Sequence, residues 1–233
     1  MRTFKVLSML LMYPDEEIVA GLDDMAAILD QEALLPPAAR KGLDVLMRHL
    51  ATSDLMDSQA AYVSLFDQSR SLSLHLFEHI HGDSRERGQA MADLIDHYRS
   101  FGMEVSAAEL PDFLPLFLEF LSTQPLHEAL SMLGEAVNIL ALLRSRLEKR
   151  GAPYAPVFRA LEALSPVGAD EEAIQEQVKG EKRDDTSAAL DKSWEDAPVT
   201  FGPEPARGHT GDGTRAQYSV PVESVRVMRR SRP

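Results

Sequence analysis

The chain has 233 residues, of which 44% are hydrophobic, and a formal net charge of −13. It is long enough to bury one substantial core. The absence of cysteine excludes disulfides, thiolate nucleophiles, iron–sulfur ligation and thiolate zinc sites. So acidic a surface repels nucleic-acid phosphates and anionic lipids, and we therefore expect no nucleic-acid partner.

No apolar run approaches the roughly 20 residues that a bilayer span requires. The first 17 residues superficially resemble a signal peptide, but their apolar segment is short and continues directly into a helical pattern. We interpret this segment as the first helix of the fold. We expect a cytoplasmic protein with no direct membrane insertion.

Helical patterns follow one another from the N-terminus to residue 164. Several begin with proline and acidic residues, and the longest ends in basic residues before Gly151, as helix termini prefer. No stretch alternates as a β-strand would. The chain is therefore predicted to be all-α, with one globular helical bundle over residues 1–165. The expected helices cover residues 4–12, 14–31, 36–51, 53–67, 71–81, 83–102, 109–122, 125–151 and 153–164.

The composition changes at residue 166. Residues 166–233 are polar, charged and rich in glycine and proline, which predicts a mobile tail, with one short helix near residues 170–178. Within this tail, residues 193–201 place Trp194 close to Val199 and Phe201. Such residues in a disordered segment often mark a docking motif, so we expect these three to serve tail docking.

The stretch HLFEH contains His75, Glu78 and His79 in the H-x-x-E-H spacing of one class of zinc peptidase. On a helix the two histidines would share a face, but no third ligand is marked in the sequence. The surrounding segment is apolar almost all round, which indicates a central helix whose histidines are partly buried or line a groove. We predict no metal site, no cofactor and no catalytic residue.

Two stretches carry a family resemblance. AYVSLFDQSRSLSLHLFEHIHGDSRERGQAM and ELPDFLPLFLEFLS resemble the two signature regions of the redox-enzyme maturation chaperones, the TorD/DmsD/NarJ group. LLMYPDEE and SWEDAPVTF are similar to the branch that serves respiratory nitrate reductase, whose members are also called its delta subunit. The resemblance covers nearly the whole chain.

The first family motif, a tyrosine followed three residues later by Leu-Phe, falls on Tyr62, Leu65 and Phe66. The acidic residue that usually precedes this tyrosine is missing, since residues 59–61 are Gln-Ala-Ala. A role for that acid is therefore not carried over to this chain.

The second family motif, Pro-Asp-His with a later glutamate, falls on Pro111, Asp112 and Glu119. Its histidine is replaced by Phe113. Functions ascribed to that histidine in the family, nucleotide contacts among them, are not transferred here.

The resemblance implies an all-helical chaperone without enzymatic turnover. Its expected partner is the apo catalytic (alpha) subunit of nitrate reductase, bound mainly at its N-terminal segment and held competent for insertion of the molybdenum cofactor. Proteins that deliver this cofactor are a further expected partner. The chaperone is expected to be absent from the finished enzyme.

A basic, apolar peptide would dock between helices, with its apolar side on Leu and Phe residues and its arginines on carboxylates. Each candidate has a simpler interpretation: the apolar ones as core, Tyr62 as core or groove edge, and Asp112 as a helix cap. Histidines beside the groove would make binding depend on pH between about 5.5 and 7.5. The predicted peptide-binding residues are Tyr62, Leu65, Phe66, Asp67, His75, His79, Pro111, Asp112, Phe113, Leu116, Phe117 and Glu119.

Two alternative functions remain open. The chain could be a stable helical adaptor or scaffold subunit of a redox complex, which would stay in the purified complex. It could also be a zinc hydrolase built on the H-x-x-E-H stretch. Stoichiometric zinc that is lost in a His75→Ala variant would identify the second.

Overall fold

The structure, a computed structural model, describes residues 1–82, 84–106, 109–186, 188–189 and 191. Within these ranges every regular element is helical, which confirms the predicted all-α fold class, and one isolated antiparallel bridge joins His75 to Phe113. The elements are α1 (Arg2–Leu10), α2 (Glu16–Ala20), α3 (Leu22–Glu32), α4 (Pro37–Thr52), α5 (Leu55–Tyr62), the π-helical turn η1 (Val63–Asp67), the 3-10 turn η2 (Arg70–Leu72), α6 (Leu76–His81), α7 (Glu86–Ser100), α8 (Leu114–Thr123), α9 (Leu126–Arg150), α10 (Ala155–Leu164) and α11 (Glu171–Gly180).

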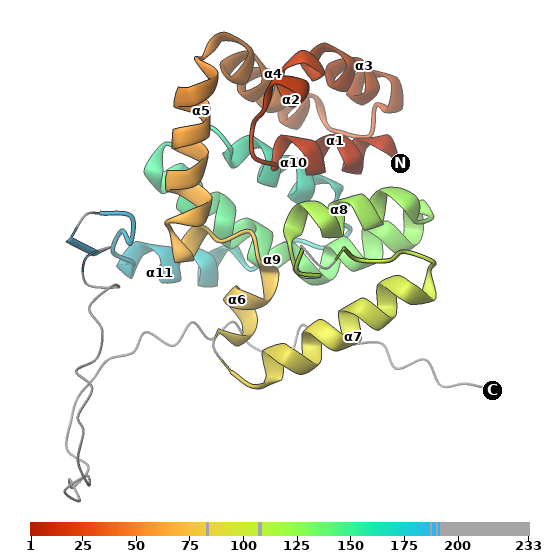
Figure 1. Ribbon diagram of the computed structural model, residues 1–233, viewed down its shortest axis with the longest axis vertical. Coiled ribbons are helices and arrows are strands. Elements are labelled where there is room, and N and C mark those ends of the chain that lie inside the picture. The colour runs from red at the N-terminus through yellow and green to blue at the C-terminus, as the bar shows by residue number, and fades with distance from the viewer. Residues whose placement is uncertain (83, 107–108, 187, 190, 192–233) are drawn as a thin grey trace, which may run out of the picture.

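Helix α9 is the centre of the bundle (Figure 1), where it contacts α6, η2, α8, α10 and α11. Its buried Leu140, Leu143 and Leu147 recur at the spacing of one helical face. The helix ends at Gly151, whose φ of 65° lies in the left-handed region that favours glycine. This stop lets the chain reverse into α10, which packs along α9.

Among the described residues, α9 is the helix whose length and composition would allow a membrane crossing. The prediction concerned an uninterrupted apolar run of roughly 20 residues, whereas α9 qualifies through its mean hydropathy over an 18-residue window. Half of its most apolar window is buried inside the protein. Such burial is typical of the central helix of a bundle, which is apolar because it is surrounded by other helices.

The remaining core is built around α1 and α8, which pack against each other. From α1, the side chains of Phe4, Leu7 and Leu10 are at most 1% exposed. Helix α7 joins this core through Tyr98, whose ring lies 4.6 Å from that of Phe120. These contacts fix α8, and with it the preceding residues 111–113, relative to the rest of the bundle.

Several boundaries differ from the sequence prediction. The helix expected over 14–31 divides at Gly21 into α2 and α3. The helix expected over 53–67 continues as η1, where the Gln68 N–H donates to the Val63 carbonyl, one residue beyond the α-helical partner. The helix expected over 71–81 begins only at Leu76, because the preceding residues are held extended by pairing with another segment.

Part of the segment assigned to the C-terminal tail is helical in the described chain. The short helix expected near residues 170–178 is present as α11, and its Ile174 and Val178 are buried against α9. Residues 181–185 then make ion pairs with α9. In this structure two buried apolar side chains and paired charges attach residues 171–185 to the bundle, and the mobility of the tail stays a prediction.

Candidate functional site

The two motif regions meet at a short backbone pairing. The N–H of Leu76 donates to the carbonyl of Asp112 at 3.0 Å, and the N–H of Leu114 donates to the carbonyl of Leu74 at 2.8 Å. Between these bonds the His75 ring lies 5.4 Å from the Phe113 ring. The structure thus brings together His75, Asp112 and Phe113, which sequence analysis had grouped only by motif.

Asp112 caps a helix, but not the one that follows it in the sequence. One of its carboxylate oxygens accepts a hydrogen bond from the Phe77 N–H at 3.1 Å, in the first turn of α6. The same oxygen lies 3.8 Å from the Arg87 guanidinium. Helix α8 begins after Phe113 without a side-chain cap. Asp112 is therefore a cap supplied from a distant part of the chain, which satisfies an otherwise unpaired donor of α6.

The carboxylate of Asp112 is fully buried. It was predicted to face an arginine of a bound peptide, but in this structure its partners are all internal. Burying a carboxylate costs free energy unless it is paired and hydrogen-bonded, and this one contacts His75, Phe77 and Arg87. A direct contact between Asp112 and the peptide stays a prediction, while the contacts seen here join α6 to the segment before α8.

His75 stands before α6 rather than on it. Its backbone is extended, and its Nδ1 lies 3.1 Å from Oδ1 of Asp112. The hydrogen bond with this carboxylate raises the pKa of His75 above its ordinary value, against the opposing effect of burial. Since its side chain keeps 28% exposure, His75 is a titratable group at the surface of the site.

His79 is buried in the protein. Its Nε2 lies 2.8 Å from the carbonyl oxygen of Ser73, and its Nδ1 lies 3.4 Å from Nη1 of Arg146. Because a carbonyl can only accept and a guanidinium can only donate, Nε2 carries the proton and Nδ1 is the acceptor. Burial lowers the pKa of His79 to about 4. The hypothesis of pH-dependent binding concerned histidines beside the groove, so it does not extend to this buried side chain and stays a prediction for His75.

The H-x-x-E-H stretch does not form the arrangement of a zinc peptidase. His75 precedes the helix and is bonded to Asp112, while both ring nitrogens of His79 have partners inside the protein. In the described part of the chain, no group of three or more histidine or acidic side chains is placed to hold a metal ion.

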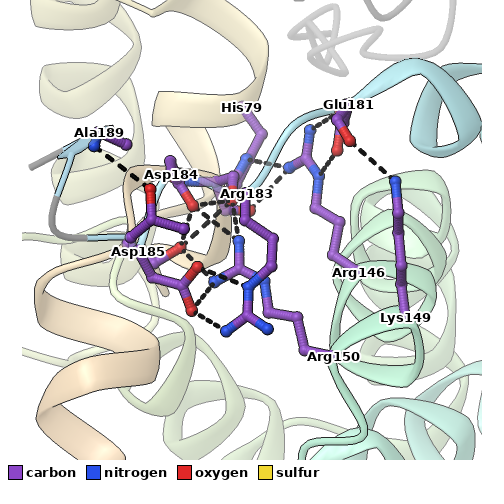
Figure 2. A network of polar contacts seen from close by, with 12 residues as sticks. His79, Arg146, Lys149, Arg150, Glu181, Arg183, Asp184, Asp185 and Ala189 are labelled. Carbon is purple, nitrogen blue, oxygen red and sulfur yellow. Dashed lines mark hydrogen bonds and ion pairs between the residues drawn. The ribbon is translucent and has the colours of Figure 1, made fainter.

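A network of charges surrounds the loop that leads into His75 (Figure 2). Arg146 of α9 forms a two-pronged contact with Glu181, with distances of 2.8 Å from Nε and 2.6 Å from Nη2, and donates to the Ser71 carbonyl at 2.8 Å. One turn later, Arg150 contacts Asp184 at 2.7 Å and Asp185 at 3.3 Å. Both arginines are nearly fully buried.

The first motif belongs to an aromatic cluster. The ring of Tyr62 lies 4.9 Å from Phe66 and 6.0 Å from Tyr154, and its hydroxyl donates to the Leu11 carbonyl at 2.8 Å. Tyr62 is 4% exposed, and burial raises its pKa far above the ordinary value. Of the two interpretations offered for Tyr62, the structure selects core.

The predicted residues divide by exposure. Tyr62, Phe66, His79, Pro111, Asp112 and Phe117 are buried, whereas Leu65, Asp67, His75, Phe113, Leu116 and Glu119 reach the surface. Phe113, Leu116 and Glu119 follow at three-residue spacing, so they share one side of α8. Glu119 forms an ion pair with Lys5 of α1. Leu110, which is 49% exposed, precedes this series and was not predicted.

A hollow of about 570 Å³ lies elsewhere, between α9 and α11, where its lining includes Ser145, Glu148, Gln175 and Lys179. None of the predicted peptide-binding residues lines it. The predicted docking residues Trp194, Val199 and Phe201 lie outside the described residues.

Sequence analysis missed the polar partners of the site. Arg146 and Arg150 were interpreted only as the basic end of α9, although a spacing of four places them on one face of the helix. Their acidic partners belong to the stretch EKRDD, residues 181–185, which had been assigned to the tail. The charge pattern was a usable signal, but the pairing between distant segments is visible only in the structure.

The fold is that of the redox-enzyme maturation proteins. A crystal structure titled as a "Putative Redox Enzyme Maturation Protein" from Archaeoglobus fulgidus aligns with a TM-score of 0.51 and 26% identity, covering 69% of this chain and 91% of that one. A family model described as "Nitrate reductase delta subunit" matches residues 32–160. The chain belongs to this nitrate reductase delta subunit family.

Relatives in the family carry chaperone names. The chain is 42% identical over 196 residues to the "Nitrate reductase molybdenum cofactor assembly chaperone NarJ" of Escherichia coli strain K12, covering 84% of this chain and 83% of that protein. It is 32% identical over 182 residues to a "Probable nitrate reductase molybdenum cofactor assembly chaperone NarJ" of Bacillus subtilis, covering 76% and 94%.

Proposed function

We propose that this protein is an assembly chaperone for a nitrate reductase. It binds the cofactor-free catalytic subunit through the N-terminal segment of that subunit, holds it competent for insertion of the molybdenum cofactor, and leaves before the enzyme is complete. The observation that carries this proposal is the 42% identity to the Escherichia coli chaperone, spread over 84% of the chain.

The internal contacts of the site support a binding role rather than turnover. The partly exposed His75 is paired with the Asp112 carboxylate, and two further candidates for acid–base chemistry, His79 and Asp112, are buried and hydrogen-bonded within the protein. A general acid or base has to reach the proton that it transfers, and neither group is at the surface. We therefore propose that the protein is not an enzyme.

The surface that meets the client is proposed to be the exposed side of the motif region. Leu110, Phe113 and Leu116 offer apolar area, and His75 stands beside Phe113. Glu119, with 44% of its side chain exposed, offers a carboxylate at the end of this series. Such a strip fits a peptide with one apolar side and basic residues, and the net charge of −13 favours its approach.

The buried half of the predicted set is proposed to hold this surface in shape. Asp112 joins the start of α6 to the segment before α8. The packed rings of Tyr62 and Phe66 hold the π-helical turn η1 in the core. A chaperone that acts before cofactor insertion meets its client where the client is synthesised, so we place the complex in the cytoplasm.

The proposal is tested by mixing the protein with its nitrate reductase catalytic subunit, prepared either without cofactor or as the mature enzyme, and following co-elution by size-exclusion chromatography. Co-elution with the cofactor-free subunit alone is the expected result. Stable co-elution with the mature enzyme would support a permanent adaptor subunit instead. Failure to bind either form would contradict the proposal.

A further inference from the structure

Three acidic residues after α11 connect the C-terminal part of the described chain to the loop that precedes His75. We call Glu181, Asp184 and Asp185 the acidic latch. Figure 2 shows them facing Arg146 and Arg150, which project from α9. The latch lies far along the sequence from the motifs, but it is next to the segment that carries one of them.

Asp184 accepts several hydrogen bonds from this loop. Its carboxylate accepts hydrogen bonds from the Ser69 hydroxyl at 2.9 Å, the Ser71 hydroxyl at 2.9 Å and the Ser71 N–H at 2.7 Å. Arg150 donates to the same carboxylate at 2.7 Å and to both serine hydroxyls, at 2.9 Å to Ser69 and 2.7 Å to Ser71. Burial acts to raise the pKa of Asp184, but these hydrogen bonds outweigh it and lower that pKa below its ordinary value.

The same loop is also hydrogen-bonded to the histidines of the candidate site. Two residues beyond Ser71, the Ser73 hydroxyl accepts the His75 N–H at 3.2 Å, and the Ser73 carbonyl accepts the His79 Nε2–H at 2.8 Å. Arg146 touches both ends of this connection, since it donates to the Ser71 carbonyl and to Nδ1 of His79. Displacing the latch would therefore release the loop that orients both histidines.

The apolar attachment of this segment is small. Ile174 and Val178 of α11 pack against Ala141 and Leu142 of α9, in a cluster separate from the main core. Four side chains of this size contribute little compared with the main bundle. The paired charges of the latch add to this attachment, because charge-assisted hydrogen bonds between buried groups are among the stronger polar contacts. Lys149 contributes as well, since it donates to the carbonyls of Val178 at 2.6 Å and Glu181 at 2.9 Å.

We infer that the acidic latch, bound through Arg146 and Arg150, positions the loop of residues 69–75 and so sets the geometry of the His75–Asp112 surface for client binding. Glu181 and Asp184 are positioning residues, which act through the arginines and the loop without touching the client. The part of this inference that concerns the client rests on the proposed chaperone function. The part that concerns the loop stands on the contacts alone.

The loop is tested by hydrogen exchange on the full-length protein. A Glu181→Gln/Asp184→Asn variant removes two latch charges with little change in shape. Glu172→Gln/Glu176→Gln removes two charges from exposed side chains of α11 and serves as a matched control. We expect amide exchange over residues 69–79 to accelerate by about tenfold or more in the latch variant, because several charge-assisted bonds are lost, and to stay unchanged in the control.

Two milder variants guard against general unfolding. Asp184→Asn alone leaves Arg150 paired with Asp185, and Asp184→Glu keeps the charge. Faster exchange in Asp184→Asn that is restored in Asp184→Glu, with α1 and α10 protected as in the wild type, supports the latch. Unchanged exchange over 69–79 in both Asp184→Asn and the double variant would overturn it.

Client binding is measured separately, with the N-terminal peptide of the catalytic subunit. We expect at least about fivefold weaker binding to the latch variant than to the control variant, a coupling of ordinary size. Equal affinity combined with faster exchange would overturn the positioning role. Absence of binding to the wild type as well would count against the proposed client segment, and the exchange result would still decide whether the latch holds the loop.

Discussion

Nδ1 of His75 lies 3.1 Å from Oδ1 of Asp112, across 37 positions of the sequence. One partner is partly exposed and the other fully buried. The pair therefore links a side chain at the proposed client surface to a carboxylate that also caps α6. Each of the two segments that carry the family resemblance contributes one residue to this pair. The pair therefore holds the two segments together.

An Asp112→Ala variant is expected to lose about 3 kcal/mol of unfolding free energy. It removes the cap of α6 and the carboxylate partner of His75, and it leaves Arg87 with Glu78. Breaking a buried charged pair costs several kcal/mol. Urea denaturation measures the loss. A His75→Ala variant should lose clearly less, because His75 is partly exposed. Equal losses would show that the cap contributes little.

The hydrogen bond with Asp112 raises the pKa of His75, with Glu78 adding to the rise and burial and Arg87 opposing it. The stabilisation from this pair is fully present below the ordinary pKa of 6.5 and is lost as pH rises through the folded value. In an Asp112→Asn variant, an NMR titration of the His75 ring should give a lower pKa than in the wild type. An unchanged pKa would show that the side chains of His75 and Asp112 do not interact in solution.

His79 should affect stability in the opposite direction. Burial lowers its pKa to about 4 in the folded protein, while Arg146 also lowers it and Ser73, Glu78 and Glu181 raise it. The unfolded chain therefore takes up a proton first as pH falls below 6.5, and stability is lost progressively down to the folded value. The loss due to this residue between pH 7.5 and 5 is on the order of 2 kcal/mol.

A His79→Gln variant isolates this effect, because the glutamine amide can still donate to the Ser73 carbonyl but does not titrate. The difference in unfolding free energy between wild type and variant should shift by that amount between the two pH values. A constant difference would show that His79 is not buried in solution. His97, whose pKa burial also lowers, is unchanged in both proteins and cancels.

A Tyr62→Phe variant is expected to be less stable by about 1 kcal/mol, because it removes a buried hydrogen bond to the Leu11 carbonyl. The neighbouring Tyr13, which is 45% exposed and packs edge-on against Tyr62, provides the control. Tyr13→Phe should change stability by less than about 0.5 kcal/mol. Equal effects in urea denaturation would contradict the assignment of Tyr62 to the core.

The helical architecture could be predicted from the sequence, because apolar spacing, prolines and terminal charges mark most helices. Helix α9, for example, was expected over residues 125–151 and occupies Leu126–Arg150. The extended residues before α6 could not be predicted. Their local pattern continues that of a helix, and only the pairing of Leu74 and Leu76 with the segment before α8 overrides it.

The site was predicted as a group of residues but not as an arrangement. The motifs identified Asp112 and His75, yet not that the carboxylate is buried beneath the imidazole. The latch was missed for a related reason. A polar, charged segment such as residues 181–185 has the composition of a solvated tail, and its order comes from Arg146 and Arg150, more than 30 positions away.

The most direct test of the chaperone function is a calorimetric titration with a peptide from the N-terminus of the nitrate reductase catalytic subunit. The wild type, a Phe113→Ser/Leu116→Ser variant of the proposed surface, and a Val45→Ser control would be compared, since Val45 is 55% exposed on α4. We predict micromolar or tighter binding by the wild type and the control, weakened about tenfold or more in the surface variant, as expected when two apolar contact residues are replaced. Equal affinity of all three proteins for the peptide would contradict the proposed surface, and no binding by the wild type would contradict recognition of this segment.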